Sequence, residues 1–346
     1  MNRKTNQNKE AMKEMMKAIV ATGYGAPDVL KLQQVDKPQP KENEVLVKAH
    51  ASSVTTADGM MRTGKPYFGR LVTGLTKPKH PIPGTGFSGV VEAVGEKVEM
   101  FQPGDEVFGE TTLGFSTNAE YFTIPEKGVI LYKPDNLCFT DAATFCDGHL
   151  TSLSFLKEIA QIKPGQKVLI NGASGSLGTA AVQIAKYIGA EVTGVCSTRN
   201  VGLVKSLGAD FVIDYTKKDF TKAGKTYDVV YDTVGKSSYS RSKNILSDSG
   251  LYVSPVLKFS LLLKMMWTSL FGKKKAKFSA TGLRSDEDLR KQLAELVTIF
   301  KEGKLKTVID RQYPLEKVAE AHTYIASGHK KGNVVIIVQP GSDSPW

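Results

Sequence analysis

One stretch near the middle of the chain constrains the fold more than any other. Residues 168–200 read VLINGASGSLGTAAVQIAKYIGAEVTGVCSTRN. An apolar run at 168–170 precedes a glycine-rich turn, a helical pattern over 177–188 and a second β-type run over 191–196. This order is typical of a βαβ unit, in which a helix joins two parallel strands. A chain that contains it is expected to build a parallel sheet covered by helices.

The same alternation extends through the second half of the chain. The pattern predicts strands at 167–170, 191–196, 211–214, 228–232 and 250–254, with helices at 177–188, 201–207 and 239–246. A helix over 142–160 precedes them, and a helix (286–302), a strand (310–313), a helix (315–327) and a strand (332–338) follow. Strands and helices at this spacing predict a doubly wound parallel sheet with helices on both faces.

The first third of the chain has a different character. Short β-type runs with Pro and Gly between them predict strands at 18–21, 30–35, 44–51, 89–94, 105–108, 120–124 and 129–132. No long helical periodicity precedes residue 141. We therefore expect an antiparallel, barrel-like β domain before the parallel sheet.

The glycine-rich turn matches a dinucleotide fingerprint. Ala173-Ser174-Gly175-Ser176-Leu177-Gly178 is GxGxxG with alanine at the first glycine position, and Gly172 stands just before it. Gly175 lets the backbone approach a pyrophosphate, and Gly178 lets the helix pack closely on the strand. Amide groups at the start of the helix would face the anion. The position of the motif between a strand and a helix favours nucleotide binding over an ordinary turn.

The end of the second strand indicates which nucleotide binds. NAD sites usually place an acidic residue there, whereas NADP sites replace it with a cation. Here no acid stands between Glu191 and Asp210, and Ser197, Thr198 and Arg199 follow the strand. An arginine can make a bidentate contact with a phosphate. The sequence predicts NADP, with a simple surface ion pair of Arg199 as the alternative.

Charge and cysteine content limit the remaining classes. The formal net charge is +11, which suits solubility, an anionic ligand or an anionic surface. No aromatic–basic stacking motif accompanies that charge, which argues against nucleic-acid binding. The three cysteines have no metal-ligand spacing, and their odd number argues against a disulfide framework, so a reducing cytoplasm is expected. Residues 1–15 are polar and predict a disordered tail.

Residues 255–278, PVLKFSLLLKMMWTSLFGKKKAKF, are unusual for this kind of sheet. Their apolar residues fit a loose helical stripe, and a lysine cluster at 273–277 follows. One interpretation is a helix that covers a substrate cleft or a subunit interface. The other is a basic amphipathic helix on an anionic membrane surface, which would make the protein peripheral to a membrane.

Several further motifs carry a family resemblance. They are GYGAPDVLKL (23–32), EVLVKAHASSVTTAD (44–58), PGTGFSGVVEAVGEKVEMFQPGDEVFG (83–109), IKPGQKVLINGASGSLGTAAVQIAK (162–186), YDVVYDTVG (227–235) and GHKKGNVVI (328–336). Over residues 16–338 the chain resembles the zinc-independent quinone oxidoreductase-like branch of the medium-chain dehydrogenase/reductase superfamily. The resemblance implies a GroES-like β-rich catalytic domain (16–144 plus 284–346) with an inserted Rossmann doubly wound parallel sheet (145–283).

The positions of zinc ligands in zinc-dependent relatives are filled by other residues here. Thr55-Thr56-Ala57-Asp58 stands in place of a cysteine-containing group, and Thr85-Gly86 in place of His-Glu. Cys146 lies near the third ligand region, but alone it is interpreted as a small buried apolar residue. Catalytic zinc needs three protein ligands, so no metal is predicted.

The resemblance also assigns roles to individual residues. It implies an NADPH-dependent oxidoreductase that transfers hydride to a quinone or an α,β-unsaturated carbonyl compound, and a homodimer. The alternative is a non-catalytic NADP-binding protein with a membrane-surface or nucleic-acid partner. The implied catalytic residues are Thr55 and Thr151. Tyr67, in the loop after residues 61–64, is our own candidate for the proton donor, and solvent is the alternative source. The implied cofactor-binding residues are Ser174, Gly175, Ser176, Leu177, Gly178, Ser197, Arg199, Tyr215, Val234, Gly235, Lys331, Gly332 and Asn333.

Overall fold

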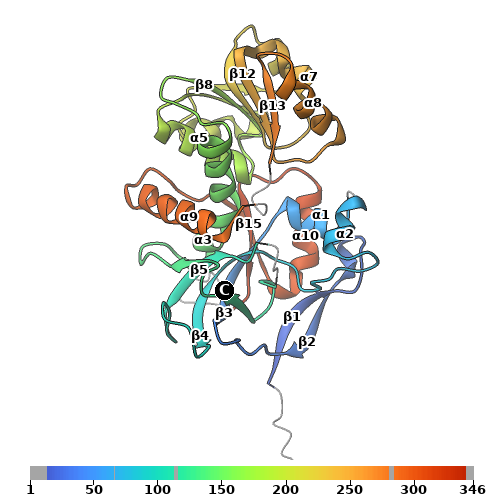
Figure 1. Cartoon of the computed structure of the whole chain (residues 1–346), viewed down its shortest axis with the longest axis vertical. Helices are drawn as coiled ribbons and strands as arrows, with labels where there is room; N and C mark the ends of the chain where they lie inside the picture. The colour runs from blue at the N-terminus through green and yellow to red at the C-terminus, as the bar shows by residue number, and fades with distance from the viewer. Residues whose placement is uncertain (1–13, 66, 113–115, 280–283, 340–346) are drawn as a thin grey trace, which may run out of the picture.

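The computed structural model describes residues 14–339 except 66, 113–115 and 280–283. It has two parts, a parallel sheet with helices and a mainly antiparallel β part (Figure 1). Most of the predicted tail, residues 1–15, lies outside the described residues, and strand β1 already begins at Met15. Within the described residues, no helix is both long and apolar enough to cross a membrane.

The parallel sheet has six strands in the order β10-β9-β8-β11-β12-β13. The strands are β8 (Lys167–Asn171), β9 (Glu191–Cys196), β10 (Phe211–Asp214), β11 (Tyr227–Asp232), β12 (Leu246–Ser254) and β13 (Lys275–Phe278). The order reverses between β8 and β11, and ligands bind in the crevice at such a reversal. This confirms the predicted Rossmann sheet. Sequence analysis missed β13, which takes up part of the lysine cluster.

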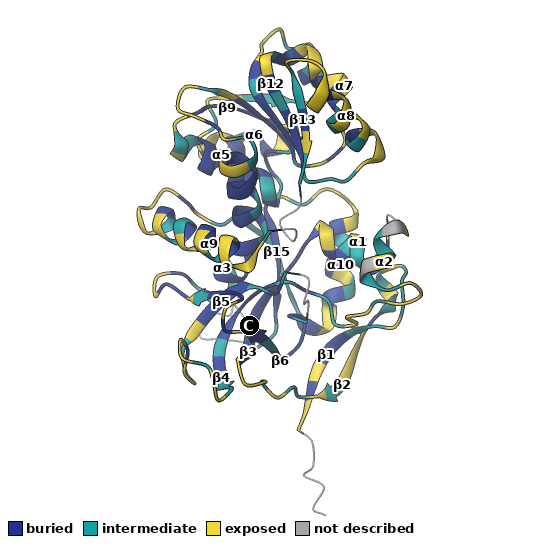
Figure 2. Cartoon of the chain, in the orientation of Figure 1, coloured by how far each residue is buried: buried dark blue, intermediate teal, exposed yellow. Residues whose placement is uncertain are grey.

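Helices cover both faces of this sheet. They are α5 (Ser176–Ile188), α6 (Val201–Ser206), α7 (Tyr239–Ser242) and α8 (Phe259–Leu270), with short turns η5 (Thr198–Asn200), η6 (Phe220–Lys222) and η7 (Lys243–Ile245). Val182 and Ile184 of α5 belong to one buried apolar cluster, and Leu261 of α8 belongs to a second. Figure 2 shows the strands buried between these two layers.

The antiparallel strands form the other domain. Its main sheet runs β14-β15-β3-β4-β5-β7, with β6 also pairing with β3. The strands are β3 (Glu44–Val54), β4 (Gly86–Val94), β5 (Glu106–Glu110), β6 (Tyr121–Pro125), β7 (Val129–Tyr132), β14 (Ile309–Pro314) and β15 (Asn333–Ile337), and β1 (Met15–Ala21) forms a separate pair with β2 (Leu30–Asp36). Because β15 pairs with β3, a segment late in the chain returns to the first domain.

Two helices in the first third were not predicted. They are α1 (Thr56–Thr63) and α2 (Arg70–Thr73), and short turns η1 (Pro27–Val29) and η2 (Tyr67–Gly69) lie near them. Both are short, so they do not contradict the expectation that no long helical periodicity precedes residue 141. Thr55 and Asp58 start α1 with a capping box, and Gly64 ends it at φ 60°. Helix α1 thus forms through local end signals, and both helices are too short to show periodicity.

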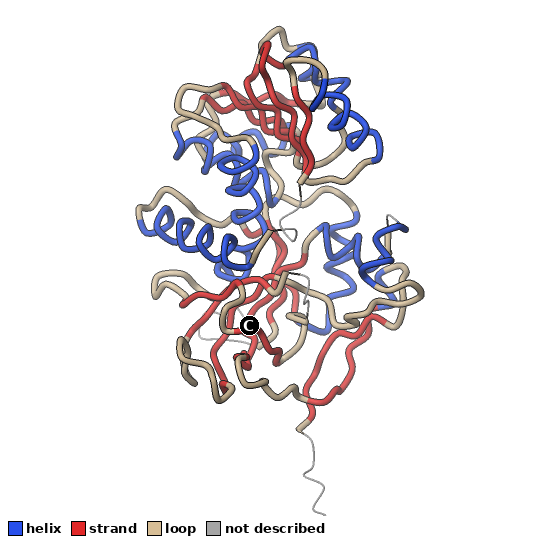
Figure 3. Tube along the Cα trace, viewed as in Figure 1, coloured by secondary structure: helices blue, strands red, loops and turns tan. Residues whose placement is uncertain are grey.

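A long helical segment joins the two parts. It runs through α3 (Phe139–Thr144), η3 (Phe145–Leu150), α4 (Thr151–Leu153) and η4 (Ser154–Ile159), where η3 and η4 are π-type turns. Helix α9 (Asp286–Lys301) packs beside it, and η9 (Leu315–Lys317) with α10 (Val318–Ala326) precedes β15 (Figure 3). Phe108 of β5, Phe145 of η3 and Leu293 of α9 share one buried cluster with the Rossmann strands, so the two parts are joined by a common core.

Candidate active site

The glycine turn leaves open space where a ligand can approach the backbone. Gly172 has φ +81°, and a Cβ at Gly178 would lie 2.1 Å from the Gly172 carbonyl oxygen. Packing within the chain therefore requires glycine at 178. At Gly175, the residue before α5, a Cβ would meet only the Gly172 oxygen, at 3.5 Å. The small residue at 175 thus leaves room beside the amide groups at the start of α5, which favour an anion.

The chain segment before β15 docks onto this turn. The Gly332 amide donates to the Ser174 carbonyl oxygen at 2.8 Å, and Gly332 and Gly175 form an isolated parallel bridge. The Ser176 hydroxyl lies 2.6 Å from Asn333 Oδ1. The structure therefore brings together predicted residues that lie more than 150 positions apart. Lys331, the neighbouring predicted residue, is exposed, and its amide donates to Asp310.

The loop after β9 lies on the other side of the turn. Asn200 Nδ2 donates to Ser174 Oγ at 2.9 Å, and Arg199 Nη2 donates to the His329 carbonyl oxygen at 3.1 Å. Arg199 thus reaches across the loop toward the late segment that bears Gly332. The predicted Ser197 precedes this loop, and the predicted Tyr215 is 58% exposed at the end of β10.

A carboxylate also lies at this loop, and the search for an acidic residue at the end of β9 did not identify it. Thr198 Oγ1 donates to Asp214 Oδ2 at 2.5 Å. Hydrogen bonds from Thr198 and Thr216 lower the pKa of Asp214, so this carboxyl is charged at neutral pH. Asp214 ends β10, the strand that pairs with β9, so sequence spacing within the βαβ unit does not reveal it.

A buried carboxylate shapes the loop that the resemblance assigns to the nicotinamide. Asp232 is fully buried at the end of β11, and Oδ1 accepts from the amides of Val234 (3.3 Å) and Gly235 (3.0 Å). Asp232 also accepts from Asn171 Nδ2 and from the Tyr252 hydroxyl, both at 2.8 Å. These bonds hold the predicted pair 234–235 in place, and sequence analysis had not identified Asp232, which lies just before that pair.

Four ionisable side chains from distant segments influence one another near this site. They are Asp58 of α1, Glu110 of β5, Asp147 of η3 and Lys330 of the segment before β15. Burial, with Asp147 and Asp58 as further causes, raises the pKa of Glu110 to about 8, and its Oε2 has no hydrogen-bond partner among the described residues. Burial raises the pKa of Asp58 to about 6 and lowers that of Lys330. Asp58 is buried and the other three residues are half-buried, and we call these four residues the buried charge cluster.

One contact links the buried charge cluster to the glycine turn. The Ser176 hydroxyl lies 2.8 Å from Asp147 Oδ2 as well as 2.6 Å from Asn333 Oδ1. A hydroxyl carries one hydrogen, so both oxygens cannot receive it. Burial is the largest cause that raises the pKa of Asp147, while Lys330 and the Ser176 hydroxyl act in the opposite direction. The single Ser176 hydroxyl hydrogen therefore links either Asp147 or Asn333 to the glycine turn at any one time.

The residues predicted to be catalytic have different surroundings. Thr55 is buried and caps α1, since its side chain accepts from the Asp58 amide at 3.1 Å. Thr151 is half-buried at the start of α4. Tyr67 is 66% exposed on η2, with the Arg70 guanidinium 4.9 Å from its ring centre. The structure therefore places Tyr67 at the surface.

The donor groups for a metal ion are absent from the described part of the chain. Within residues 14–339, leaving out the gaps named above, no group of three or more His, Cys, Asp or Glu side chains could hold a metal ion. Cys146 is fully buried, and burial raises the pKa of its thiol well above the usual value. The thiol therefore stays protonated at neutral pH, which is unfavourable for metal binding.

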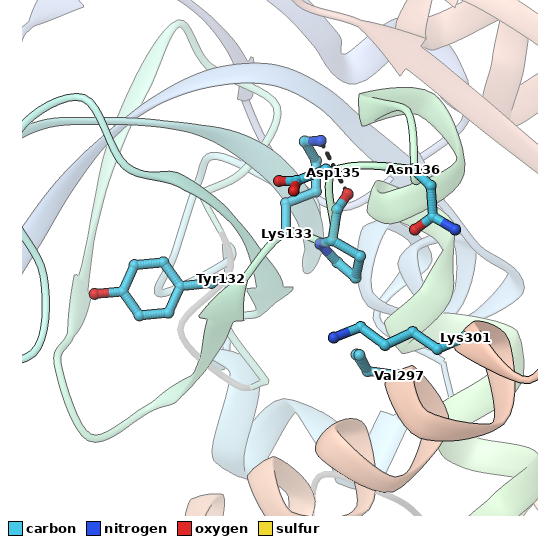
Figure 4. A pocket seen from close by; sticks show the side chains of 7 residues that line it. Tyr132, Lys133, Asp135, Asn136, Val297 and Lys301 are labelled. Carbon is cyan, nitrogen blue, oxygen red and sulfur yellow. Dashed lines mark hydrogen bonds between the residues drawn. The ribbon is translucent and has the colours of Figure 1, made fainter.

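A surface hollow of about 440 Å³ lies away from these residues. It is lined by Tyr132, Lys133, Pro134, Asp135, Asn136, Val297 and Lys301 (Figure 4). Lys133 forms an ion pair with Glu106 at 2.8 Å and donates to the Pro134 carbonyl oxygen at 3.2 Å, so its positive charge is balanced within the chain. The hollow contains none of the predicted site residues.

Comparisons with known proteins agree with this arrangement. The family model of the alcohol dehydrogenase GroES-like domain matches residues 41–135, and that of the zinc-binding dehydrogenase matches residues 207–336. The 2-methylene-furan-3-one reductase of Solanum lycopersicum is 34% identical over 333 residues, which cover 93% of this chain and 79% of that protein. The chloroplastic NADPH-dependent alkenal/one oxidoreductase of Arabidopsis thaliana is 30% identical over 94% of this chain and 80% of its own. The solved quinone oxidoreductase of Coxiella burnetii superposes with a TM-score of 0.83 at 30% identity, covering 94% of this chain and all of that one.

Proposed function

Because the chain belongs to the quinone oxidoreductase-like branch of the medium-chain dehydrogenase/reductase superfamily, we propose that it is an NADPH-dependent reductase of quinones or α,β-unsaturated carbonyl compounds. The observation that carries the proposal is the junction of three segments at the glycine turn. Gly332 bonds to Ser174, and Asn200 bonds to the same serine from the other side. This junction fits a dinucleotide that runs from the β9 loop to the 234–235 loop.

Three groups of residues would hold the nucleotide. The turn 174–178 and Asn333 would bind the pyrophosphate, Ser197 and Arg199 the 2′-phosphate, and Val234 and Gly235 would border the nicotinamide. When bound, NADPH supplies the hydride for an electron-poor carbon of the acceptor. Asp214 opposes a second anion near Thr198, so the phosphate must be held on the Arg199 side of the loop. The printed name of the Arabidopsis relative, an NADPH-dependent enzyme, supports this choice of cofactor.

The chemistry proposed here needs no zinc. Zinc serves alcohol oxidation by stabilising an alkoxide. A conjugated acceptor instead spreads its negative charge into an enolate or a quinol oxygen, and the described residues offer no metal-binding group. This is why we propose quinones and enones, rather than simple alcohols, as substrates.

Reduction also requires a proton. We propose that the protonated Glu110 carboxyl supplies it, because the raised pKa keeps a proton on this buried group at neutral pH. Tyr67 and solvent are the alternative sources. Glu110→Gln should lower kcat with an enone at least tenfold, whereas Tyr67→Phe should leave it within about twofold. The opposite ranking would assign the proton to Tyr67.

The main test follows the oxidation of NADPH with a quinone, an alkenal and a simple alcohol. We expect turnover with the first two and none with the alcohol, and kcat/KM at least tenfold higher for NADPH than for NADH. Arg199→Ala should remove most of that preference, whereas Lys205→Ala, an exposed change on α6, should not. Equal use of NADH by the unchanged protein would refute the assignment of Arg199. Failure with every acceptor would favour the alternative, a non-catalytic NADP-binding protein with a membrane-surface or nucleic-acid partner.

We also propose that the protein is a cytoplasmic homodimer. β13 ends the order of the described parallel sheet, so its outer side is available for another chain. Sedimentation equilibrium tests the assembly, and a mass of one chain at micromolar concentration would refute it. All three cysteines are free thiols, as expected for a reducing compartment.

A further inference from the structure

Helix α8 is apolar on two opposite faces, although it lies at the surface. Leu261, Met265 and Thr268 pack inward over β12 and β13. The outward face carries Phe259, Leu263, Met266, Trp267 and Leu270, which are 51–76% exposed. Their spacing of four, three, one and three residues forms a single stripe along the helix. Figure 2 shows this exposed face on α8. An apolar stripe of this size on a surface helix indicates an interaction site.

A second exposed apolar group lies in the other domain. Tyr67, Leu71 and Leu75, on and beside α2, are 66–77% exposed. In Figure 1, α2 and α8 lie on the same side of the molecule, one in each domain. We call residues 59–91 the α2 segment and residues 249–285 the α8 segment.

Both segments are attached to the candidate active site. The α2 segment directly follows Asp58 of the buried charge cluster. The α8 segment follows the loop at 234–235, and Lys258, just before α8, donates to the carbonyl oxygens of Gly235 and Ser237. The exposed apolar groups therefore belong to two segments that adjoin the candidate active site, one beside Asp58 and the other through the contact of Lys258 with the 234–235 loop.

The charge of the two segments identifies the partner. The α2 segment contains five of the 46 basic residues and the α8 segment contains seven, and neither contains any of the 35 acidic ones. The rest of the chain holds 34 basic and 35 acidic residues, so the two segments account for the whole excess of +11. The ion pairs found in the described part of the chain use none of these twelve side chains.

From this coincidence we infer that the α2 and α8 segments dock the protein onto an anionic lipid surface. The stripe on α8 and the apolar side chains near α2 enter the headgroup region, and the exposed lysines of the two segments contact lipid phosphates. A second copy of the chain would carry the same positive charge on the same surface, so charge favours lipid over self-association through the exposed stripe of α8. The proposed dimer would instead use the outer side of β13. On the basis of the proposed function, this orientation turns the active site toward the membrane and favours lipophilic quinones or enones as substrates.

Binding is tested with the full-length protein and without any substrate. Vesicles of phosphatidylcholine with 30% phosphatidylglycerol are compared with pure phosphatidylcholine vesicles by co-sedimentation, at about 0.05 and 0.5 M salt, where screening differs strongly. The apolar variant is Met266→Ser with Leu270→Ser, and the charge variant is Lys264→Glu with Lys273→Glu. Because all four side chains are exposed, both variants should keep the melting temperature of the unchanged protein.

We expect binding to the anionic vesicles only, weakened by salt. The apolar and charge variants should each lower the partition coefficient at least tenfold. The matched control, Lys205→Glu with Lys222→Glu, makes the same charge change at exposed positions outside the two segments and should lower it less than threefold. With Trp346 replaced by Phe, Trp267 becomes the single tryptophan, and its emission should shift to the blue on binding.

Three results would overturn the inference. The first is that the protein does not bind anionic vesicles. The second is that the charge variant loses vesicle binding while the apolar variant keeps it. The third is that the protein self-associates through α8, and the apolar variant abolishes this self-association without changing vesicle binding. The substrate part is tested separately. Both variants should lose turnover of a long-chain quinone held in vesicles but keep turnover of a short water-soluble quinone. If the soluble quinone is not reduced by the unchanged protein, the proposed function fails and the vesicle result stands alone.

Discussion

Replacing Glu110 by Gln should change how the stability of the protein depends on pH. Glu110 lies at the end of β5, its Oε2 has no hydrogen-bond partner among the described residues, and its pKa in the folded chain is raised from 4.5 to about 8. Burial is the main cause, and the charges of Asp147, Asp58 and Asp286 act in the same direction. Glutamine has nearly the same shape but carries no titrating proton.

The direction of the effect follows from proton binding. Between pH 4.5 and 8 the folded chain keeps the Glu110 proton while the unfolded chain releases it, so the free energy of unfolding falls as pH rises. The limiting slope is about 1.4 kcal/mol per pH unit, and the two pKa values give at most about 3.5 kcal/mol between pH 5 and pH 8. Below pH 4.5 the full stability is present, and above pH 8 no further loss occurs. Asp58 contributes in the same direction at lower pH but is unchanged in the variant.

Calorimetry of the unchanged protein and of Glu110→Gln from pH 5 to pH 8 measures this difference. The midpoint of the unchanged protein should fall relative to that of the variant by up to roughly 7 °C, at about 2 °C per kcal/mol for a large chain. Glu96→Gln is the control, because Glu96 is an exposed acid of the same domain and should leave the pH dependence unaltered. Parallel curves for the unchanged protein and Glu110→Gln would refute the reasoning, since they would mean that Glu110 titrates normally when folded.

Four further substitutions separate ligand binding from packing. Gly175→Ala should change the free energy of unfolding by no more than about 1 kcal/mol, yet weaken NADPH binding measured by fluorescence at least tenfold. Gly178→Ala should destabilise the fold by about 2–3 kcal/mol, because its Cβ would lie 2.1 Å from the Gly172 carbonyl oxygen; equal stabilities of the two alanine variants would contradict this. Asp232→Asn should destabilise by at least about 3 kcal/mol in urea unfolding, since it leaves several buried donors without a carboxylate, whereas Tyr252→Phe removes one of those donors and should destabilise by about 1.5 kcal/mol. A larger loss in the tyrosine variant would contradict this account of the loop.

The elements that sequence alone predicted well are those with a strong local signal. The strand bounds 211–214 and 129–132 agree with β10 and β7, and the glycine turn lies where the fingerprint placed it. Hydrophobic periodicity and glycine positions are properties of consecutive residues, so they can be read without knowing the fold. The residues before β15 were expected at the turn only because of the family resemblance, and their bonds to Ser174 and Ser176 now give a physical reason for that position.

What the sequence did not predict depends on contacts between distant segments. Glu110, Asp147 and Lys330 are ordinary residues in their local contexts, and their altered pKa values arise only when β5, η3 and the segment before β15 come together. Asp214 was not identified for a similar reason, because it contacts Thr198 from the neighbouring strand and not from a nearby position in the sequence. The lysine cluster was read as following a helix, but Lys275–Phe278 form β13, since pairing with β12 outweighs the low strand preference of lysine.

The bond between Gly332 and Ser174 has a consequence for biosynthesis. The turn at 174–178 leaves the ribosome long before residues 332–333, so a nascent chain can fold its first βαβ unit without yet possessing a complete nucleotide pocket. Assembly of the pocket must await β15, which at the same time closes the antiparallel sheet against β3. A nucleotide that binds there, as in the proposed function, would stabilise only chains whose two domains are both finished, so its binding would act on the last stage of maturation rather than on the first.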